Sequence, residues 1–201
     1  MKSVLLSIHP KWVHKILDGP KTIEIRKTRP KIETPFKCYI YCTKGDEVLA
    51  YHDYCGFDME DFSGDFIANT KVVAEFTCDR IDPIRVFNNG TIQNWMNYGL
   101  ERSCVPYDEI VKYIGNNRSG YGWHISCLKV YEKPKPLSWF VTEGDCDCMN
   151  CKKCGWFNKG NGYNVEDDCD LGYENIGRET PLKPLFRPPQ SWCYVEEVPG
   201  C

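Results

Sequence analysis

The sequence predicts an α+β protein that is mainly β, built as a small, partly closed β-barrel with short decorating helices and a Cys-rich insertion. Several short segments alternate apolar and polar residues, which is typical of half-buried strands, whereas few segments have the period of a helix. Four of the thirteen cysteines fall within nine residues, which marks a segment of different composition. With 201 residues, 42% of them hydrophobic, the chain is long enough to bury a core.

The first half of the chain is predicted to form strands around one short helix. Residues 3–8 read as an apolar strand. A helix is expected over residues 10–18, because Pro10 suits a first turn and the apolar residues share one face. Alternating runs indicate three more strands, over residues 21–27, 36–43 and 71–81. Residues 45–66 carry seven acidic residues and no Lys or Arg, which indicates an exposed loop.

The second half divides at a Lys-Pro repeat. Helices are predicted over residues 91–98 and 106–114, and a strand over residues 122–131. The prolines within residues 133–136 interrupt regular structure and mark a domain edge. We therefore expect three regions: residues 1–140 as the barrel, 141–180 as the Cys-rich insertion, and 181–201 as a C-terminal strand that returns to the barrel.

The N-terminal end is strongly basic. The first 31 residues contain eight Lys or Arg and two Asp or Glu, although the whole chain has a net charge of -3. Within residues 21–27, alternation places Ile23 and Ile25 on the core face and Glu24 and Arg26 on the other, with Lys21 at the mouth after a Gly-Pro turn. Cations and a carboxylate on a rigid strand form a candidate anion or base-edge site. The simpler alternative is a solvated basic face.

Charge concentrated in this way favours a nucleic-acid partner. The predicted cleft consists of Lys21, Glu24 and Arg26. Phosphate contacts, which supply affinity independent of sequence, are predicted for Lys27, Arg29 and Lys31. A flipped base also needs an aromatic ring to stack on. We place Trp123 in the predicted site; the other aromatic candidates are Trp12, Trp95 and Tyr121, and for each of the four a core position is the alternative.

The cysteines fall into two groups. The scattered ones are expected to be small buried hydrophobes: Cys38, Cys42, Cys55, Cys78, Cys104 and Cys127. The clustered ones predict a structural zinc site, because the Cys151/Cys154 pair followed by Gly155 has the spacing of a zinc knuckle. The predicted ligands are drawn from Cys146, Cys148, Cys151, Cys154 and Cys169, with Cys193 as a further candidate. A redox dithiol and idle thiols are the alternatives.

The N-terminus and the hydropathy lead us to expect a cytoplasmic protein. No segment approaches the roughly 20 apolar residues of a membrane span. The apolar run after Met1 is too short for a signal peptide. In that compartment the cysteines are expected to be reduced or bound to metal.

Two stretches, residues 5–10 and 16–27, resemble the N-terminal signature of the ASCH domain, a member of the PUA-like superfamily. Residues 71–76 and 122–125 continue the match, and residues 187–195 are similar to the ending of phage and bacterial members, which often carry cysteines just before it. The specific part is the pattern Gly-x-Lys-x-x-Glu-x-Arg that ends at Arg26. The resemblance implies a PUA-like barrel with a cleft beside the second strand, and binding of RNA or of a modified base.

One branch of that family resembles an amidohydrolase that deacetylates N4-acetylcytidine. Lys21 matches its lysine, but Glu24 stands where the branch has a threonine. A carboxylate donates a hydrogen bond only when protonated, so Glu24 would act as a base beside Lys21. Glu75, within a strand, does not match the distal carboxylate of that branch. Three functions follow: a module that binds RNA or a modified nucleotide, an amidohydrolase using Lys21 and Glu24, and a zinc-stabilised protein-interaction module.

Overall fold

The computed structural model describes residues 2–47, 49, 67–94, 99–143 and 182–197. This part of the chain is mainly β, as the sequence predicts, and it contains two α-helices. Its strands form a seven-stranded and a four-stranded sheet, and neither strand order closes on itself. The predicted barrel closure is therefore absent from the described strands. Among the described residues, no helix is both long and apolar enough to cross a membrane.

The larger sheet contains both ends of the described chain. Its strand order is β10 (Leu182–Pro184), β9 (Phe140–Glu143), β11 (Trp192–Glu197), β1 (Ser3–Ile8), β3 (Phe36–Cys42), β4 (Lys71–Cys78) and β8 (Ser126–Pro136). The first strand, β1, pairs antiparallel with β11 and parallel with β3. The parallel pairing requires a crossover, and the helix α1 (Pro10–Leu17) lies within it.

The smaller sheet has the order β2 (Ile23–Arg26), β7 (Arg118–His124), β5 (Ile81–Val86) and β6 (Ile92–Asn94). The chain passes between the two sheets four times, from β1 to β2, from β2 to β3, from β4 to β5 and from β7 to β8. The predicted strands over residues 71–81 and 122–131 are split at the last two of these passages. The predicted helix over residues 91–98 is wrong at its start, because residues 92–94 pair with β5.

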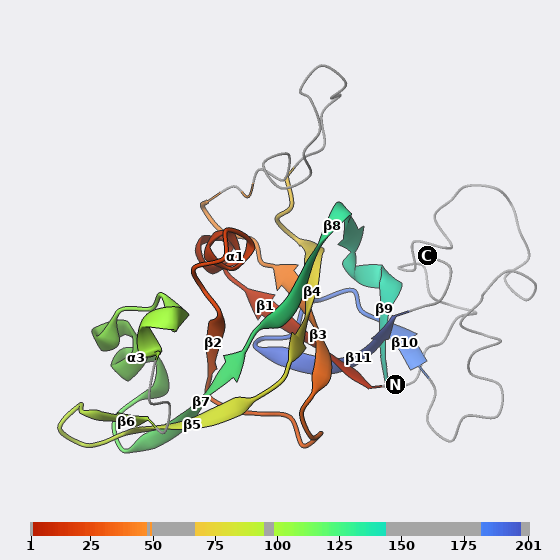
Figure 1. Cartoon of the computed structure of the whole chain (residues 1–201). Coiled ribbons are helices and arrows are strands. Elements are labelled where there is room, and N and C mark those ends of the chain that lie inside the picture. Colours follow the sequence, from red (N-terminus) through yellow and green to blue (C-terminus); the bar gives the residue numbers. More distant parts are fainter. Residues whose placement is uncertain (1, 48, 50–66, 95–98, 144–181, 198–201) are drawn as a thin grey trace, which may run out of the picture.

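Each sheet has its own helix, and β2 lies between the two (Figure 1). From α1, Val13 and Ile16 are buried in the core of the larger sheet. From α3 (Tyr107–Ile114), Ile110 and Ile114 pack with Ile23 of β2 in a separate apolar cluster. Short 3-10 turns occupy Leu100–Ser103 and Leu137–Trp139. Because two cores meet at β2, the space between α1 and α3 is the natural place for a site.

The prediction that the Lys-Pro repeat interrupts regular structure is wrong. Instead β8 continues to Pro136 along the edge of the larger sheet. Proline is tolerated on an edge strand, where its missing N–H is not needed by a neighbour. Farther along the chain, Glu143 of β9 pairs directly with Leu182 of β10, so residues 144–181 leave and re-enter the sheet at adjacent positions.

The described cysteines divide by burial. Cys38, Cys42 and Cys78 lie in the core, which confirms the prediction for these three. Burial raises the pKa of Cys42 to about 12, and burial together with Asp79 raises that of Cys78 to about 12. Cys127, in contrast, is exposed, and for it the prediction is wrong. A buried thiol with a raised pKa provides little thiolate for reaction.

We therefore expect N-ethylmaleimide at neutral pH to modify Cys127 in the native protein and to leave Cys42 and Cys78 unmodified until the chain is unfolded. Peptide mass spectrometry after timed labelling measures this, with denatured protein as the control. Labelling of Cys42 or Cys78 at the rate of Cys127 would contradict the buried positions.

Candidate functional site

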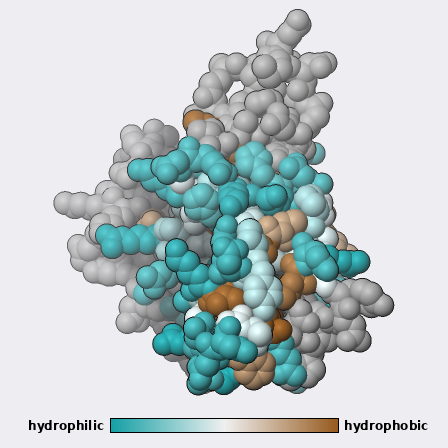
Figure 2. Space-filling view, turned by 90° about the vertical axis from the view of Figure 1, so that its left-hand side faces the viewer, coloured by the Kyte–Doolittle hydropathy of each residue, from teal (hydrophilic) through white to brown (hydrophobic). Residues whose placement is uncertain are grey.

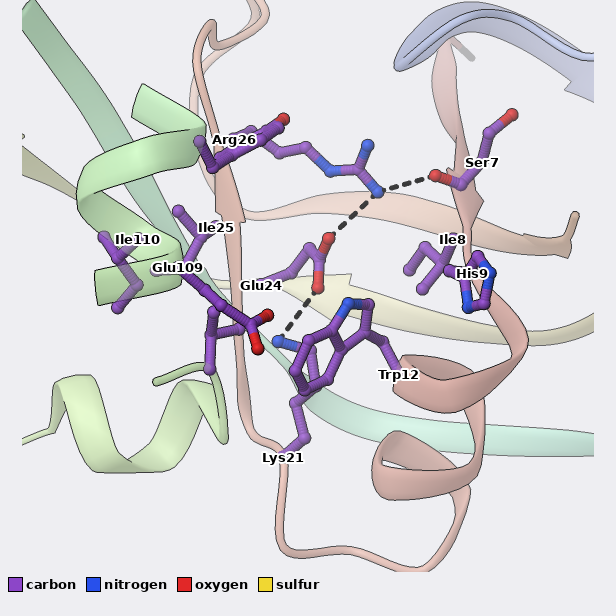
Figure 3. A pocket seen from close by; sticks show the side chains of 12 residues that line it. Ser7, Ile8, His9, Trp12, Lys21, Glu24, Ile25, Arg26, Glu109 and Ile110 are labelled. Atoms are coloured by element: carbon purple, nitrogen blue, oxygen red, sulfur yellow. Dashed lines mark hydrogen bonds and ion pairs between the residues drawn. The ribbon is translucent and has the colours of Figure 1, made fainter. Parts of the chain in front are cut away.

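A pocket of about 220 Å³ lies between β2, α1 and α3 (Figure 3). Its polar lining comes from Ser7, His9, Lys21, Glu24, Arg26 and Glu109. Its apolar and aromatic lining comes from Ile8, Trp12, Ile25, Val105, Ile110 and Tyr113. Figure 2 shows the side of the molecule on which α3 lies, where hydrophilic residues dominate the surface and hydrophobic ones form a small group.

The alternation along β2 presents its charged residues to this pocket. Ile23 and Ile25 join the apolar cluster beneath α3, while Glu24 and Arg26 line the pocket. The predicted division of the strand into two faces is therefore observed. The charged face is nevertheless buried, since Glu24 is 6% and Arg26 5% exposed, and Lys21 is only 1% exposed.

These three residues form a buried ion triad. The Nζ of Lys21 lies 3.1 Å from Oε2 of Glu24, and Nη2 of Arg26 lies 3.0 Å from Oε1. Each carboxylate oxygen of Glu24 thus faces a different cation, as Figure 3 shows. Burial of charge is tolerated because the charges are paired and hydrogen-bonded.

Two backbone carbonyls and the carboxylate of Glu24 hold Lys21 in place. Its ammonium donates to the carbonyls of Ile23 (2.9 Å) and Ser103 (2.7 Å), and its third hydrogen is available for Glu24. The same ammonium lies 5.4 Å from the ring centroid of Trp12. The arrangement makes Lys21 a fixed positive charge.

Arg26 joins β2 to the larger sheet. Its Nη2 donates to the carbonyl of Ser7 on β1 (2.9 Å), and its Nη1 donates to the carbonyl (3.1 Å) and the hydroxyl (3.3 Å) of Ser191, just before β11. No backbone ladder pairs β2 with the larger sheet among the described strands. The guanidinium therefore supplies a polar link across this gap.

The mouth of the pocket carries a second, more exposed ion pair. Lys11 of α1 and Glu109 of α3 approach to 3.9 Å across the opening, with side chains 43% and 47% exposed. The Nζ of Lys11 also lies 4.5 Å from the ring centroid of Trp12. Because this pair is exposed to solvent, salt screens it far more than it screens the triad.

The predicted site residues separate into those at the pocket and those near it. Lys27, Arg29 and Lys31 are exposed in the turn after β2, outside the pocket lining. Lys27 lies over Tyr113, 5.0 Å from its ring centroid. The turn is accessible to a large partner, and the triad is accessible only to a group that enters the pocket.

The structure does not place Trp123, a residue of the predicted site, in the pocket lining. It is fully buried in the core and packs edge-on against Phe36 and obliquely against Trp192. A base cannot reach it without displacing core residues. The aromatic rings that line the pocket are those of Trp12 and Tyr113. Glu75 lies outside the pocket lining, and its carboxylate accepts a hydrogen bond from the hydroxyl of Tyr131 (2.8 Å).

The predicted zinc ligands lie outside the described residues. Cys146, Cys148, Cys151, Cys154 and Cys169 all fall within residues 144–181. In the part of the chain that the structure describes, no group of three or more His, Cys, Asp or Glu side chains could hold a metal ion. Cys193 belongs to that described part, where it lies on β11 and burial raises its pKa to about 11.

Sequence patterns did not reveal the groups that hold the triad in place. Ser103 and Ser191 lie 82 and 165 positions away from the side chains that they bind. In the sequence, Glu109 is one of two acidic residues in the first turn of α3, and nothing there links it to the pocket. Contacts at such separations have no local pattern that could have indicated them.

We predict that Glu24→Ala lowers the free energy of unfolding by about 3–5 kcal/mol, because it leaves two buried cations without their shared anion. Urea denaturation followed by circular dichroism measures the change. Glu33→Ala, at an exposed position, is the matched control and should stay within about 0.5 kcal/mol of wild type. Equal stability of the two variants would show that the triad does not contribute as described.

Comparison with known proteins gives a distant likeness only. No family model and no curated protein matches the chain. A crystal structure of ASCH from Zymomonas mobilis matches at 16% identity and a TM-score of 0.46, over 67% of this chain and 73% of that one. A Tyr-to-Phe mutant of the same protein matches at 15% identity and a TM-score of 0.45, over 68% of this chain and 77% of that one. A Ser-to-Ala mutant matches at 14% identity and a TM-score of 0.47, over 96% of this chain and 88% of that one.

Proposed function

We propose that this chain is an ASCH-type, PUA-like module that binds RNA or a modified nucleotide through the pocket beside β2. The observation that carries the proposal is the buried triad of Lys21, Glu24 and Arg26 in a pocket walled by Trp12. Fixed polar groups beside an aromatic ring are what recognition of a single unstacked base requires. The sequence signature that ends at Arg26 supports the same assignment.

Each member of the buried triad has a role in this proposal. The carboxylate of Glu24 is held by two cations, and its remaining lone pairs accept hydrogen bonds from amino or imino groups of a base. Trp12 supplies the stacking surface, and Ile25 and Ile110 supply apolar contact. Lys21 and Arg26 keep the carboxylate in one orientation, which limits the entropy lost on binding.

The exposed turn after β2 supplies the contacts to the rest of the nucleic acid. Lys27, Arg29 and Lys31 follow directly on the strand that lines the pocket. In the proposal these cations bind phosphates on either side of the base that enters the pocket. Such contacts give affinity that falls as salt rises.

An amidohydrolase acting on N4-acetylcytidine is the second candidate, and Lys21 with Glu24 would be its catalytic pair. The hydrogen bonds favour binding over catalysis. Lys21 has no lone pair while its ammonium is engaged, and the hydroxyl of Ser7 already donates to the carbonyl of Pro189 (2.7 Å). Turnover of N4-acetylcytidine that Lys21→Met abolishes would establish this candidate in place of the binding module.

We also propose a structural zinc for the Cys-rich segment, held by four of the five cysteines Cys146, Cys148, Cys151, Cys154 and Cys169. The support is their spacing, with two thiolates separated by two residues and followed by glycine. A protein-interaction role for this segment is the third candidate function. If the segment has this role, deleting the segment would abolish partner binding, whereas substitutions in the pocket would not.

The RNA-binding proposal predicts that Lys27→Ala/Arg29→Ala/Lys31→Ala weakens binding of a transfer-RNA-sized RNA. It also predicts that the slope of log affinity against log salt falls by about 0.7 for each phosphate contact that is lost. Fluorescence anisotropy at several salt concentrations measures both. The control replaces three exposed lysines elsewhere, Lys129, Lys133 and Lys183, and removes the same charge. Equal loss in both variants would mean that only net charge matters, and the proposal would fail.

The zinc proposal predicts about one zinc per chain in purified protein, and none after residues 144–181 are replaced by an Asn-Gly turn. Because Glu143 and Leu182 are direct partners, a two-residue turn suits the junction and the remaining fold should still unfold cooperatively. Metal analysis and thermal denaturation measure the two effects. Metal-free wild-type protein purified with zinc present would contradict the proposal.

A further inference from the structure

We infer that the pocket selects a planar ring that carries one negative charge, such as a base with an ionised carboxylate substituent, over its neutral counterpart. The inference rests on the proposed function and names the class of ligand for that same pocket. Three observations carry it: the net charge of the buried triad, the rigidity of that charge, and the size and walls of the cavity.

The triad has an excess of one positive charge. Lys21, Glu24 and Arg26 are the buried ionisable side chains of Lys, Arg, Asp and Glu type in the described part of the chain. Two cations and one carboxylate leave a net charge of +1 beside the cavity. A charge removed from bulk water is unfavourable unless an opposite charge balances it.

The neighbouring charged groups of the pocket lining do not remove this excess. Glu109, the other carboxylate in the lining, is half exposed and pairs with Lys11 at the mouth. That pair is neutral as a unit and is exposed to salt. The other side chains of the lining, among them His9 and Tyr113, add no further carboxylate.

The excess charge is also fixed in position. Lys21 is anchored by the carbonyls of Ile23 and Ser103, and Arg26 by those of Ser7 and Ser191. Glu24 cannot turn toward one cation without losing the other. Because these side chains are already ordered, little entropy is lost in ordering them when a ligand binds. The fixed charge therefore discriminates well between charged and neutral ligands.

The pocket has room for one small ring. Its volume of about 220 Å³ exceeds the roughly 150 Å³ of an apolar cavity that binds benzene. One wall is the Trp12 ring, and apolar contact comes from Ile8, Ile25 and Ile110. An aromatic ring with a carboxylate directed at the triad satisfies both the apolar walls and the buried charge, whereas a neutral ring leaves the charge unbalanced.

The test compares isosteric acid and amide ligands by isothermal titration calorimetry with the full chain. The first pair is 5-carboxyuridine and 5-carbamoyluridine, which differ in charge and carry no phosphate. The second pair is benzoate and benzamide, which carry no nucleoside. We expect the acid of each pair to bind at least about tenfold more tightly than the amide, a difference of about 1.4 kcal/mol.

Lys21→Met should abolish the preference, because it brings the triad to zero net charge. Lys133→Met removes the same charge from an exposed position on β8 and should retain the preference. Circular dichroism checks that each variant is folded. If Lys21→Met does not fold, the affinities of the wild-type protein for acid and amide still test the charge selection.

The outcomes separate this inference from the proposed function. Equal or tighter binding of both amides overturns the charge selection and leaves nucleotide binding in place. Binding of benzoate over benzamide, with neither nucleoside bound, supports the charge selection and overturns nucleoside recognition. Absence of binding by all four ligands overturns both.

Discussion

The guanidinium of Arg26 connects the two halves of this fold at the place where backbone hydrogen bonding stops. The smaller sheet ends at β2, and no ladder joins that strand to β1. Arg26 bridges the gap by donating to the carbonyls of Ser7 and Ser191. Because Glu24 also pairs with this guanidinium, the link between the sheets and the charge in the pocket depend on the same side chain.

The position of the site follows from the two cores. One helix packs on each sheet, and β2 lies between them with its isoleucines directed into one core and its charged residues directed to the pocket. A strand with only one buried face would expose Glu24 and Arg26 to water. The cover provided by α1 and by the segment before β11 removes them from water and makes their pairing matter energetically.

The difference in burial gives the two groups of charges different roles in the proposed binding. Groups inside the pocket, which salt screens weakly, are suited to select among ligands. Cations in the exposed turn after β2 are suited to attract a polyanion without selecting a sequence. The chain places the two kinds of charge next to each other, on β2 and directly after it, so that one strand positions both.

The sequence by itself determined the mainly β class, most of the strands and the two faces of β2, because alternation and helical period are local properties. It did not determine the split of residues 122–131 between two sheets, nor that Trp123 would fill the core while Trp12 lines the pocket. These depend on which segments pack together, and no local period encodes that. The anchoring of the triad was likewise decided only by the tertiary structure, since Lys21 and Arg26 are bound by carbonyls 82 and 165 positions away.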